Sequence, residues 1–429
     1  MRVRTAWEMG GAACSVALAL VLLAVSPEVQ PDTGSYLGHS PERAPLYPYI
    51  LDAFLALFGE GSAFAWLART QAACLIAACA FLATRVGRAL ALDVPWRHVL
   101  FLILALPGLK FVAVILTEPL GYALLVVFWT LLAEEVLTAR ATHSWKLSAL
   151  CALGLLLRPQ LLFLPALLGV FWVAQALVRR DGASLVRLGV LLLCLGAVMG
   201  IRGGENQLRH GSFSTASSGG IHLLSSLLYI AVPADAAAIH EPAAREFFLD
   251  TLARAEARHL TRAHWDKSRA HFDVAMERIV FDVVRPAFKE HVALKVGQAG
   301  QAQFEDRLAM SAAVPLLVHM PGRYLVLLAR KAYDGQPFYY ALVVLTGALA
   351  LAHGLRAGSR PALLFAMAAL HSCMSYGVIL LAGVYSLRYI LPAEAILLAL
   401  TLAVGRALLV ASAPTAGSEQ RPFMPQGNS

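Results

Sequence analysis

Long runs of apolar residues, separated by short polar segments, dominate this chain. A helix needs about 20 apolar residues to cross the hydrocarbon layer of a bilayer, and the runs predict about ten such crossings. Their centres lie near Leu18, Leu75, Leu104, Val126, Leu153, Val170, Leu192, Val344, Met367 and Leu398. We therefore expect an all-α fold, a polytopic transmembrane helical bundle of about ten spans with a mostly helical external loop region.

The basic residues of the short loops predict the orientation of the bundle. They gather in every second loop, at Arg2 and Arg4, at Arg85, Arg88 and Arg97, at Arg140 and Lys146, at Arg179, Arg180 and Arg187, at Arg356 and Arg360, and at Arg406. Because cytoplasmic loops carry an excess of Lys and Arg, we expect this side and both termini to be cytoplasmic. The first apolar run has the basic start and apolar core of a signal peptide, but its length and Pro27 favour an uncleaved anchor. The expected location is the inner (plasma) membrane.

One long hydrophilic region, from residue 202 to 339, interrupts the apolar runs. It holds 14 of the 27 acidic and 16 of the 35 basic residues, and apolar residues at helical spacing within it predict amphipathic helices. We expect four parts: an N-terminal transmembrane region of about seven spans (1–201) with a first external loop (28–62), an external (periplasmic) loop region (202–339), a C-terminal transmembrane region of about three spans (340–410) and a cytoplasmic tail (411–429).

The composition supports a membrane protein and excludes other classes. The chain is 59% hydrophobic and 14% charged, against roughly 25% charged residues in a soluble domain. Its net charge is +8, but outside the long polar region the basic residues fall mostly in short loops, so we expect no nucleic-acid partner. The six cysteines lie within or at the ends of apolar runs without a CxxC pair, which argues against a disulfide framework or a zinc site. We expect no cofactor and no metal ligands, and leave a need for a divalent cation open.

The first polar stretch after the first apolar run, residues 31–48, concentrates reactive side chains in an otherwise apolar chain. It contains the acid Asp32, the base Arg43 and the aromatic residue Tyr47, between prolines that prevent a regular spanning helix. Polar groups beside a membrane are costly unless something polar binds there. We expect Asp32 to be catalytic, and Arg43 and Tyr47 to bind substrate.

Four further polar residues fall on the same external side in the predicted topology. Glu118 lies in the turn between the third and fourth spans, Arg158 in the turn between the fifth and sixth, and Arg388 with Tyr389 at the start of the tenth. Each has an ordinary structural interpretation: arginines snorkel to the interface, acids start helices, and tyrosines anchor in the interface. Together with Asp32, these residues place two acids and two arginines on a face that should be poor in arginine, and this coincidence favours a functional site. We expect Glu118 to be catalytic, and Arg158, Arg388 and Tyr389 to bind substrate.

This set of residues suits a substrate with a phosphate head and a long lipid tail. Arginine grips phosphate oxygens in a fork. If the lipid phosphate carries a sugar, glycosyl transfer needs one base for the proton of the acceptor hydroxyl and cations for the leaving phosphate. One acid that acts as the base, together with arginines that stabilise the leaving phosphate, is therefore sufficient for glycosyl transfer.

The chain resembles the membrane-embedded C-type (GT-C) glycosyltransferases, specifically the relatives of aminoarabinose lipid A transferase and of the dolichyl-phosphate-mannose protein mannosyltransferases. The likeness rests on Asp32 with the following RAPLYP, the TEPL turn, the RPQLLFLP turn and the LRYILP segment. It implies a polyprenyl-phosphate sugar donor, a lipid, glycan or protein acceptor, and Asp32 as the catalytic base or as the group that orients the acceptor. It also implies that Glu118 lines the site and that Arg158 and Arg388 contact the donor phosphate.

Three other functions remain open from the sequence. A lipid or polysaccharide flippase or transporter would place charges near the middle of the membrane on broken helices, whereas here the charges lie at the ends of the spans. A surface polysaccharide polymerase or ligase is chemically close but uses another acceptor. A non-enzymatic assembly protein would account for the amphipathic loop region but not for the polar residues on one face.

Overall fold

The computed structural model describes residues 2–138, 142–180, 182–211, 213, 219–265, 271–293, 301–334, 337–382 and 387–412. All regular elements in these residues are helices, with one isolated β-bridge between Glu28 and Val114. The first half contains α1 (Arg2–Leu23), α2 (Thr33–Leu37), α3 (Leu46–Phe58), α4 (Ala63–Ala89), α5 (Val94–Ala105), α6 (Gly108–Phe111), α7 (Glu118–Thr138), α8 (Ser144–Leu157), η1 (Pro159–Leu162), α9 (Phe163–Arg179) and α10 (Gly182–His210).

The second half begins with a group of shorter helices and ends with three long ones. It contains α11 (Gly219–Ile230), η2 (Pro233–Ala238), α12 (Pro242–Ala257), α13 (Arg262–Trp265), α14 (His271–Arg278), η3 (Ile279–Val284), α15 (Arg285–Ala293), α16 (Gln301–His319), α17 (Pro321–Asp334), α18 (Pro337–Ala357), α19 (Arg360–Ala382) and α20 (Leu387–Ser412). The predicted all-α fold is confirmed for the described residues.

Eight helical segments of the described chain are long and apolar enough to cross a membrane. They are Ala63–Ala89, Val94–Phe111, Glu118–Thr138, Pro159–Leu177, Gly182–His210, Phe338–Ala357, Arg360–Val378 and Ile390–Val410, and α16 with α17, bent by 96°, would be a ninth if counted as one span. The apolar runs near Leu18 and Leu153, which the sequence predicts as further spans, form the shorter apolar helices Trp7–Leu23 and Ser144–Leu157.

Helix α7 lies at the centre of the bundle. The most apolar part of α7 is 78% buried inside the protein, a larger share than in any other candidate span of the described chain. Phe128 and Trp129 are fully buried in a core that α7 shares with α4, α5, α9, α19 and α20. The apolar sequence of α7 permits this burial but does not require it, since the Gly182–His210 span is also strongly apolar and is 17% buried.

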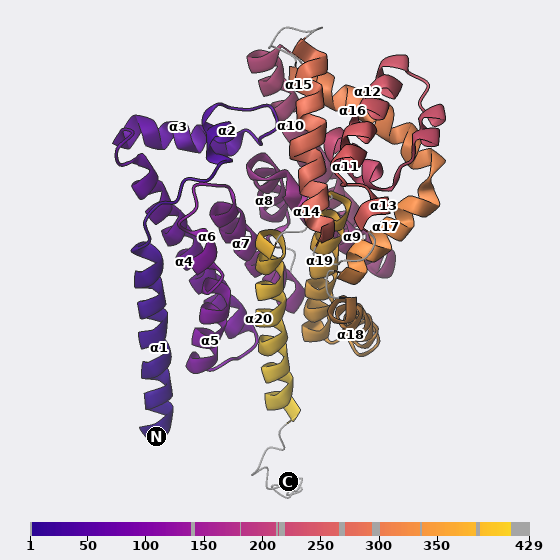
Figure 1. The fold of residues 1–429 in the computed structure, drawn as a ribbon. Helices are drawn as coiled ribbons and strands as arrows, with labels where there is room; N and C mark the ends of the chain where they lie inside the picture. The colour runs from indigo at the N-terminus through magenta and orange to yellow at the C-terminus, as the bar shows by residue number, and fades with distance from the viewer. Residues whose placement is uncertain are drawn as a thin grey trace, which may run out of the picture.

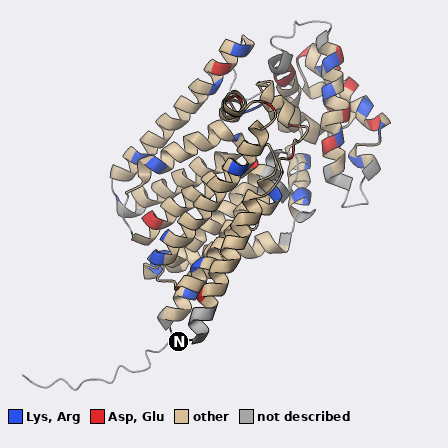
Figure 2. Cartoon of the chain, turned by 90° about the vertical axis from the view of Figure 1, so that its left-hand side faces the viewer, with Lys and Arg blue, Asp and Glu red and all other residues tan. Residues whose placement is uncertain are grey.

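Residues 219–334 form a second group of helices with a hydrophobic core of their own. Phe247, Phe248 and Phe288 are fully buried in this core. The group lies at one end of the bundle, opposite the end where α1 begins and α20 ends (Figure 1). Figure 2 shows that Lys, Arg, Asp and Glu gather in this group and near the ends of the long helices, whereas the middle stretches of the bundle carry few of them.

The segment between α1 and α4 is held against the same end of the bundle. Glu28 pairs with Val114 in the β-bridge, and Thr33 Oγ1 donates a hydrogen bond to the carbonyl oxygen of Ile115 (3.0 Å). Helices α2 and α3 then form a small core with the ends of α4 and α8 and with residues 115 and 116. The polar first loop is therefore fixed beside the start of α7 and the end of α8.

Candidate functional site

The centre of the candidate site is a buried ion pair between Glu118 and Arg158. Arg158 Nη1 lies 3.3 Å from Glu118 Oε2, and the two side chains are 9% and 8% exposed. Glu118 is the first residue of α7, and Arg158 follows α8 with extended backbone dihedrals (φ −155°, ψ 110°). Pro159 explains that geometry, because the residue before a proline is disfavoured in the helical region. Two turns that are forty residues apart in the sequence thus meet through opposite charges.

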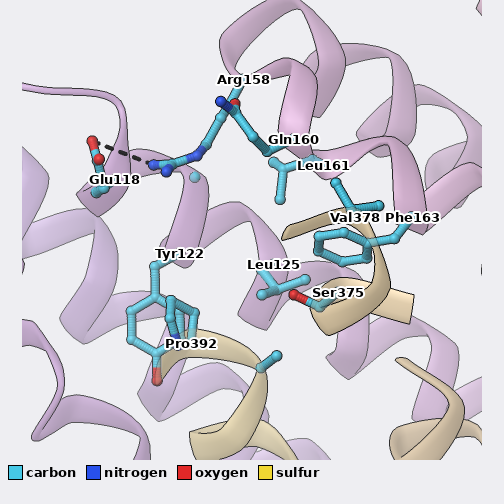
Figure 3. A pocket seen from close by; sticks show the side chains of 12 residues that line it. Glu118, Tyr122, Leu125, Arg158, Gln160, Leu161, Phe163, Ser375, Val378 and Pro392 are labelled. Carbon is cyan, nitrogen blue, oxygen red and sulfur yellow. Dashed lines mark ion pairs between the residues drawn. The ribbon is translucent and has the colours of Figure 1, made fainter. Parts of the chain in front are cut away.

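An apolar pocket lies directly below the ion pair (Figure 3). Its volume is about 40 Å³, and its lining comes from α7, the η1 turn, α9, α19 and α20. The side chains that face it are mainly apolar, and they include Tyr122, Leu125, Leu161, Phe163, Val378 and Pro392. Apart from Glu118, Arg158, Gln160 and Ser375, the lining is apolar and suits a hydrocarbon group.

A larger polar cavity lies on the other side of Arg158. It measures about 240 Å³ and is lined by Tyr36, Glu42, Arg43, Ala44, Thr117, Leu157, Arg158, Pro159, Gln160, Arg202 and Gly219. Arg158 and Gln160 line both the apolar pocket and the polar cavity. Gly219 belongs to the 219–334 group, so the cavity lies between the first loop, the bundle and that group. Three guanidinium groups in one cavity favour an anionic ligand.

Arg43 is held in the cavity wall by three neighbours from the first loop. Its Nη2 lies 2.8 Å from Asp32 Oδ1, its Nε donates a hydrogen bond to Ser35 Oγ (2.7 Å), and its guanidinium lies over the Tyr36 ring at 4.8 Å. Burial raises the pKa of Tyr36, although the charge of Arg43 opposes this. Tyr36 therefore presents a neutral hydroxyl to the cavity.

Asp32 lies at the rim of the site and reaches the cavity through Arg43. Its side chain is 40% exposed, and Asp32 itself is not part of the cavity lining. It occupies the residue before α2, but its carboxylate makes no capping hydrogen bond to that helix. Its ion pair with Arg43, and not helix capping, therefore fixes the position of this carboxylate.

Tyr47 lies behind Tyr36 and not in the cavity wall. Its ring is fully buried and packs edge-on against Tyr36, with ring centroids 5.1 Å apart. Gln71 Nε2 donates a hydrogen bond to the Tyr47 hydroxyl (2.9 Å). The predicted role of Tyr47 in binding substrate would require this ring to move, and in the structure Tyr47 supports Tyr36.

Arg388 and Tyr389 lie in the first turn of α20, and their side chains lie outside the described residues. Ile390, the next residue with a described side chain, is buried. Pro392 and Ala393, one turn further along α20, line the apolar pocket. The predicted roles of Arg388 and Tyr389 stay predictions.

Of the four charged residues that line the cavity, the sequence analysis missed two, Arg202 and Glu42. Arg202 was placed at the first position of the long polar region, but α10 continues to His210, and Arg202 is 9% exposed within it. Glu42 lines the cavity and pairs with Arg285 Nη2 of α15 (2.9 Å). The position of Arg202 directly after a long apolar run was a signal in the sequence that could have identified it. The sequence contains no signal for the pairing of Glu42.

Comparisons with family models, with curated protein sequences and with solved structures found no match to this chain. The interpretation of the site therefore rests on its geometry. Within the described residues, no group of three or more His, Cys, Asp or Glu side chains is placed to hold a metal ion. The arrangement combines a cationic cavity, an apolar pocket that meets it at Arg158, and a partly exposed carboxylate at the rim. Together these features can hold an amphiphilic anion and take up a proton beside it.

Proposed function

We propose that this chain is an integral membrane glycosyltransferase that moves a sugar from a polyprenyl-phosphate donor to an acceptor. The single observation that carries the proposal is the meeting of the cationic cavity and the apolar pocket at Arg158. A lipid-linked sugar phosphate has the same order of parts: an anionic head and a long apolar tail. The resemblance of the RAPLYP, TEPL and RPQLLFLP segments to the C-type glycosyltransferases supports the same assignment.

The proposed reaction uses the side chains in distinct roles. The oxygen of the acceptor hydroxyl bonds to the anomeric carbon, while the bond from that carbon to the phosphate oxygen breaks and leaves its electron pair on the phosphate. The acceptor proton passes to the carboxylate of Asp32. The arginines stabilise the charge that grows on the leaving phosphate. Glu118 holds Arg158 in position for this task.

The proposed topology places the site on the non-cytoplasmic face of the inner (plasma) membrane. The basic short loops favour cytoplasmic termini, and α1 begins at the end of the bundle opposite the 219–334 group (Figure 1). The cavity lies beside this group, because Gly219 lines it. A lipid-linked donor would enter from the outer leaflet and meet an external acceptor there.

Purified protein incubated with a panel of polyprenyl-phosphate sugars tests the proposal. The expected result is consumption of at least one donor with release of the polyprenyl phosphate, and loss of that activity in an Arg43→Gln/Arg158→Gln variant. Arg85→Gln is the matched control, since Arg85 is a 45% exposed arginine near the far end of α4 that forms an ion pair with Glu134. Movement of intact donor across vesicles without bond cleavage would instead identify a flippase.

A further inference from the structure

We propose that Arg202 is the main phosphate-binding residue of the cavity, and that the cavity selects a phosphodiester with one negative charge. This inference rests on the proposed function and deepens it. It comes from the charge balance of the cavity, in which the three lining arginines have different partners.

Two of the three arginines in the cavity are already matched by carboxylates. Arg43 forms an ion pair with Asp32 (2.8 Å), and Arg158 forms one with Glu118 (3.3 Å). In the described part of the chain, Arg202 forms no ion pair. Glu205, the nearest carboxylate along α10, acts on Arg202 through its charge without forming an ion pair with it, and its ion pairs are with Arg209 Nε (3.4 Å) and His39 Nδ1 (4.0 Å). The charge of Arg202 is therefore the one that remains for a ligand.

The burial of Arg202 makes a bound anion the expected partner. An arginine that only reached for the membrane surface would expose its guanidinium to water, but Arg202 is 9% exposed and lines the cavity. A buried charge without a partner is strongly unfavourable, and ionisable groups within spanning helices typically mark functional sites. A phosphate oxygen in the cavity would supply the missing charge.

The net charge of the cavity sets the charge of the ligand. The lining residues and their direct ion-pair partners comprise four arginines and three carboxylates: Arg43, Arg158, Arg202 and Arg285 with Asp32, Glu42 and Glu118. The set carries one net positive charge. It matches a lipid-linked sugar phosphate, which is a phosphodiester with one negative charge. A lipid diphosphate would bring more negative charge than the set can balance.

The specificity can be measured with two sugar-free probes, farnesyl methyl phosphate as the phosphodiester and farnesyl diphosphate. Calorimetric titration of the purified protein in detergent should show tighter binding of the phosphodiester. Arg202→Gln should weaken that binding about 10- to 100-fold, the range for loss of a hydrogen-bonded charge partner, and Arg202→Lys should weaken it less. Arg209→Gln, two turns further along the same helix, should bind like the parent. Glu42→Gln removes one negative charge from the cavity and should shift the preference towards the diphosphate.

The outcomes separate this inference from the proposed function. If the parent protein binds farnesyl methyl phosphate and the Arg202 variants bind it equally well, the role of Arg202 is overturned while the proposed function stands. If the parent protein prefers the diphosphate, the charge-matching argument is wrong. If it binds neither probe, the proposed function itself fails. Arg202→Lys keeps a cation in the bundle and carries the test if Arg202→Gln does not fold, as judged by size-exclusion chromatography.

Discussion

Glu118 and Arg158 form a buried ion pair that joins the start of α7 to the turn after α8. The pair lies at the boundary between the polar cavity and the apolar pocket, because Glu118 faces the pocket and Arg158 lines both. A buried pair contributes little net stability, but removal of one partner is costly. The pair therefore fixes the geometry of the boundary and makes that geometry sensitive to mutation.

Glu118→Gln should destabilise the protein, because it removes the carboxylate charge beside the buried Arg158. We expect the free energy of unfolding to fall by about 3–5 kcal/mol, the range for breaking a buried ion pair. Denaturant titration in detergent measures this. The control is Asp282→Asn, whose ion pair with Arg278 is exposed on both sides (40% and 46%), so a loss below about 1 kcal/mol is expected. Equal stability of the two variants would refute a special role for the buried pair.

Arg158→Lys should weaken donor binding without unfolding the protein. Lysine keeps the positive charge but lacks the fork of donors that matches a phosphate. We expect about tenfold weaker binding of the donor in a competition assay, a change of about 1.4 kcal/mol. Arg85→Lys provides the control for an arginine outside the site. Unchanged donor affinity in Arg158→Lys would leave Arg158 with a structural role only.

The fold was largely predictable from the sequence, whereas the site was predictable only in part. The apolar run of α7 is readable because its residues are apolar on all sides. Glu118 and Arg158 stand next to prolines in short turns, so their placement at one end of the bundle followed from counting spans. The pairing of Asp32 with Arg43 depends on the turn that leaves α2, where His39 adopts a left-handed backbone (φ +48°). Long-range contacts such as that of Glu42 with Arg285 depend on tertiary packing, which the local pattern does not record.

Asp235 should make the 219–334 group sensitive to acid. Burial of this carboxyl opposes its ionisation, but hydrogen bonds from the Arg323 side chain and the Val232 amide, with the charges of Arg323 and His319, hold its pKa below the usual value. The stabilisation is therefore present above about pH 4, the ordinary pKa of aspartate, and is lost as the pH falls through the lower folded pKa. Thermal unfolding between pH 7 and pH 3 should show this loss in the parent, and Asp235→Asn should unfold at a lower temperature at pH 7 and lose less on acidification. Identical pH profiles would contradict the assignment.

Gly220→Ala should loosen the contact between α11 and α16. A Cβ atom at residue 220 would lie 2.7 Å from the carbonyl oxygen of Asp306, and the Gly220 amide already donates a hydrogen bond to Asp306 Oδ1 (2.8 Å). Because backbone atoms cannot move aside as a flexible side chain can, we expect a loss of about 1–3 kcal/mol, the usual cost of overpacking. Gly322→Ala is the control, since nothing lies within 4 Å of a Cβ there. A Gly220→Ala variant as stable as Gly322→Ala would refute the close approach.

The transfer rate of Asp32→Asn, measured beside the parent protein with one polyprenyl-phosphate sugar and its acceptor, tests the central claim most directly. Asparagine keeps the size of the side chain and removes its basicity, so turnover should fall by roughly 10²-fold or more, as is usual for a lost general base. Binding of the donor should be retained or become tighter, because Arg43 keeps its place in the cavity lining and loses only the carboxylate that neutralises it. An Asp32→Asn protein that transfers sugar at the parent rate would contradict the proposed mechanism, and a parent protein that consumes no lipid-linked sugar would contradict the proposed function.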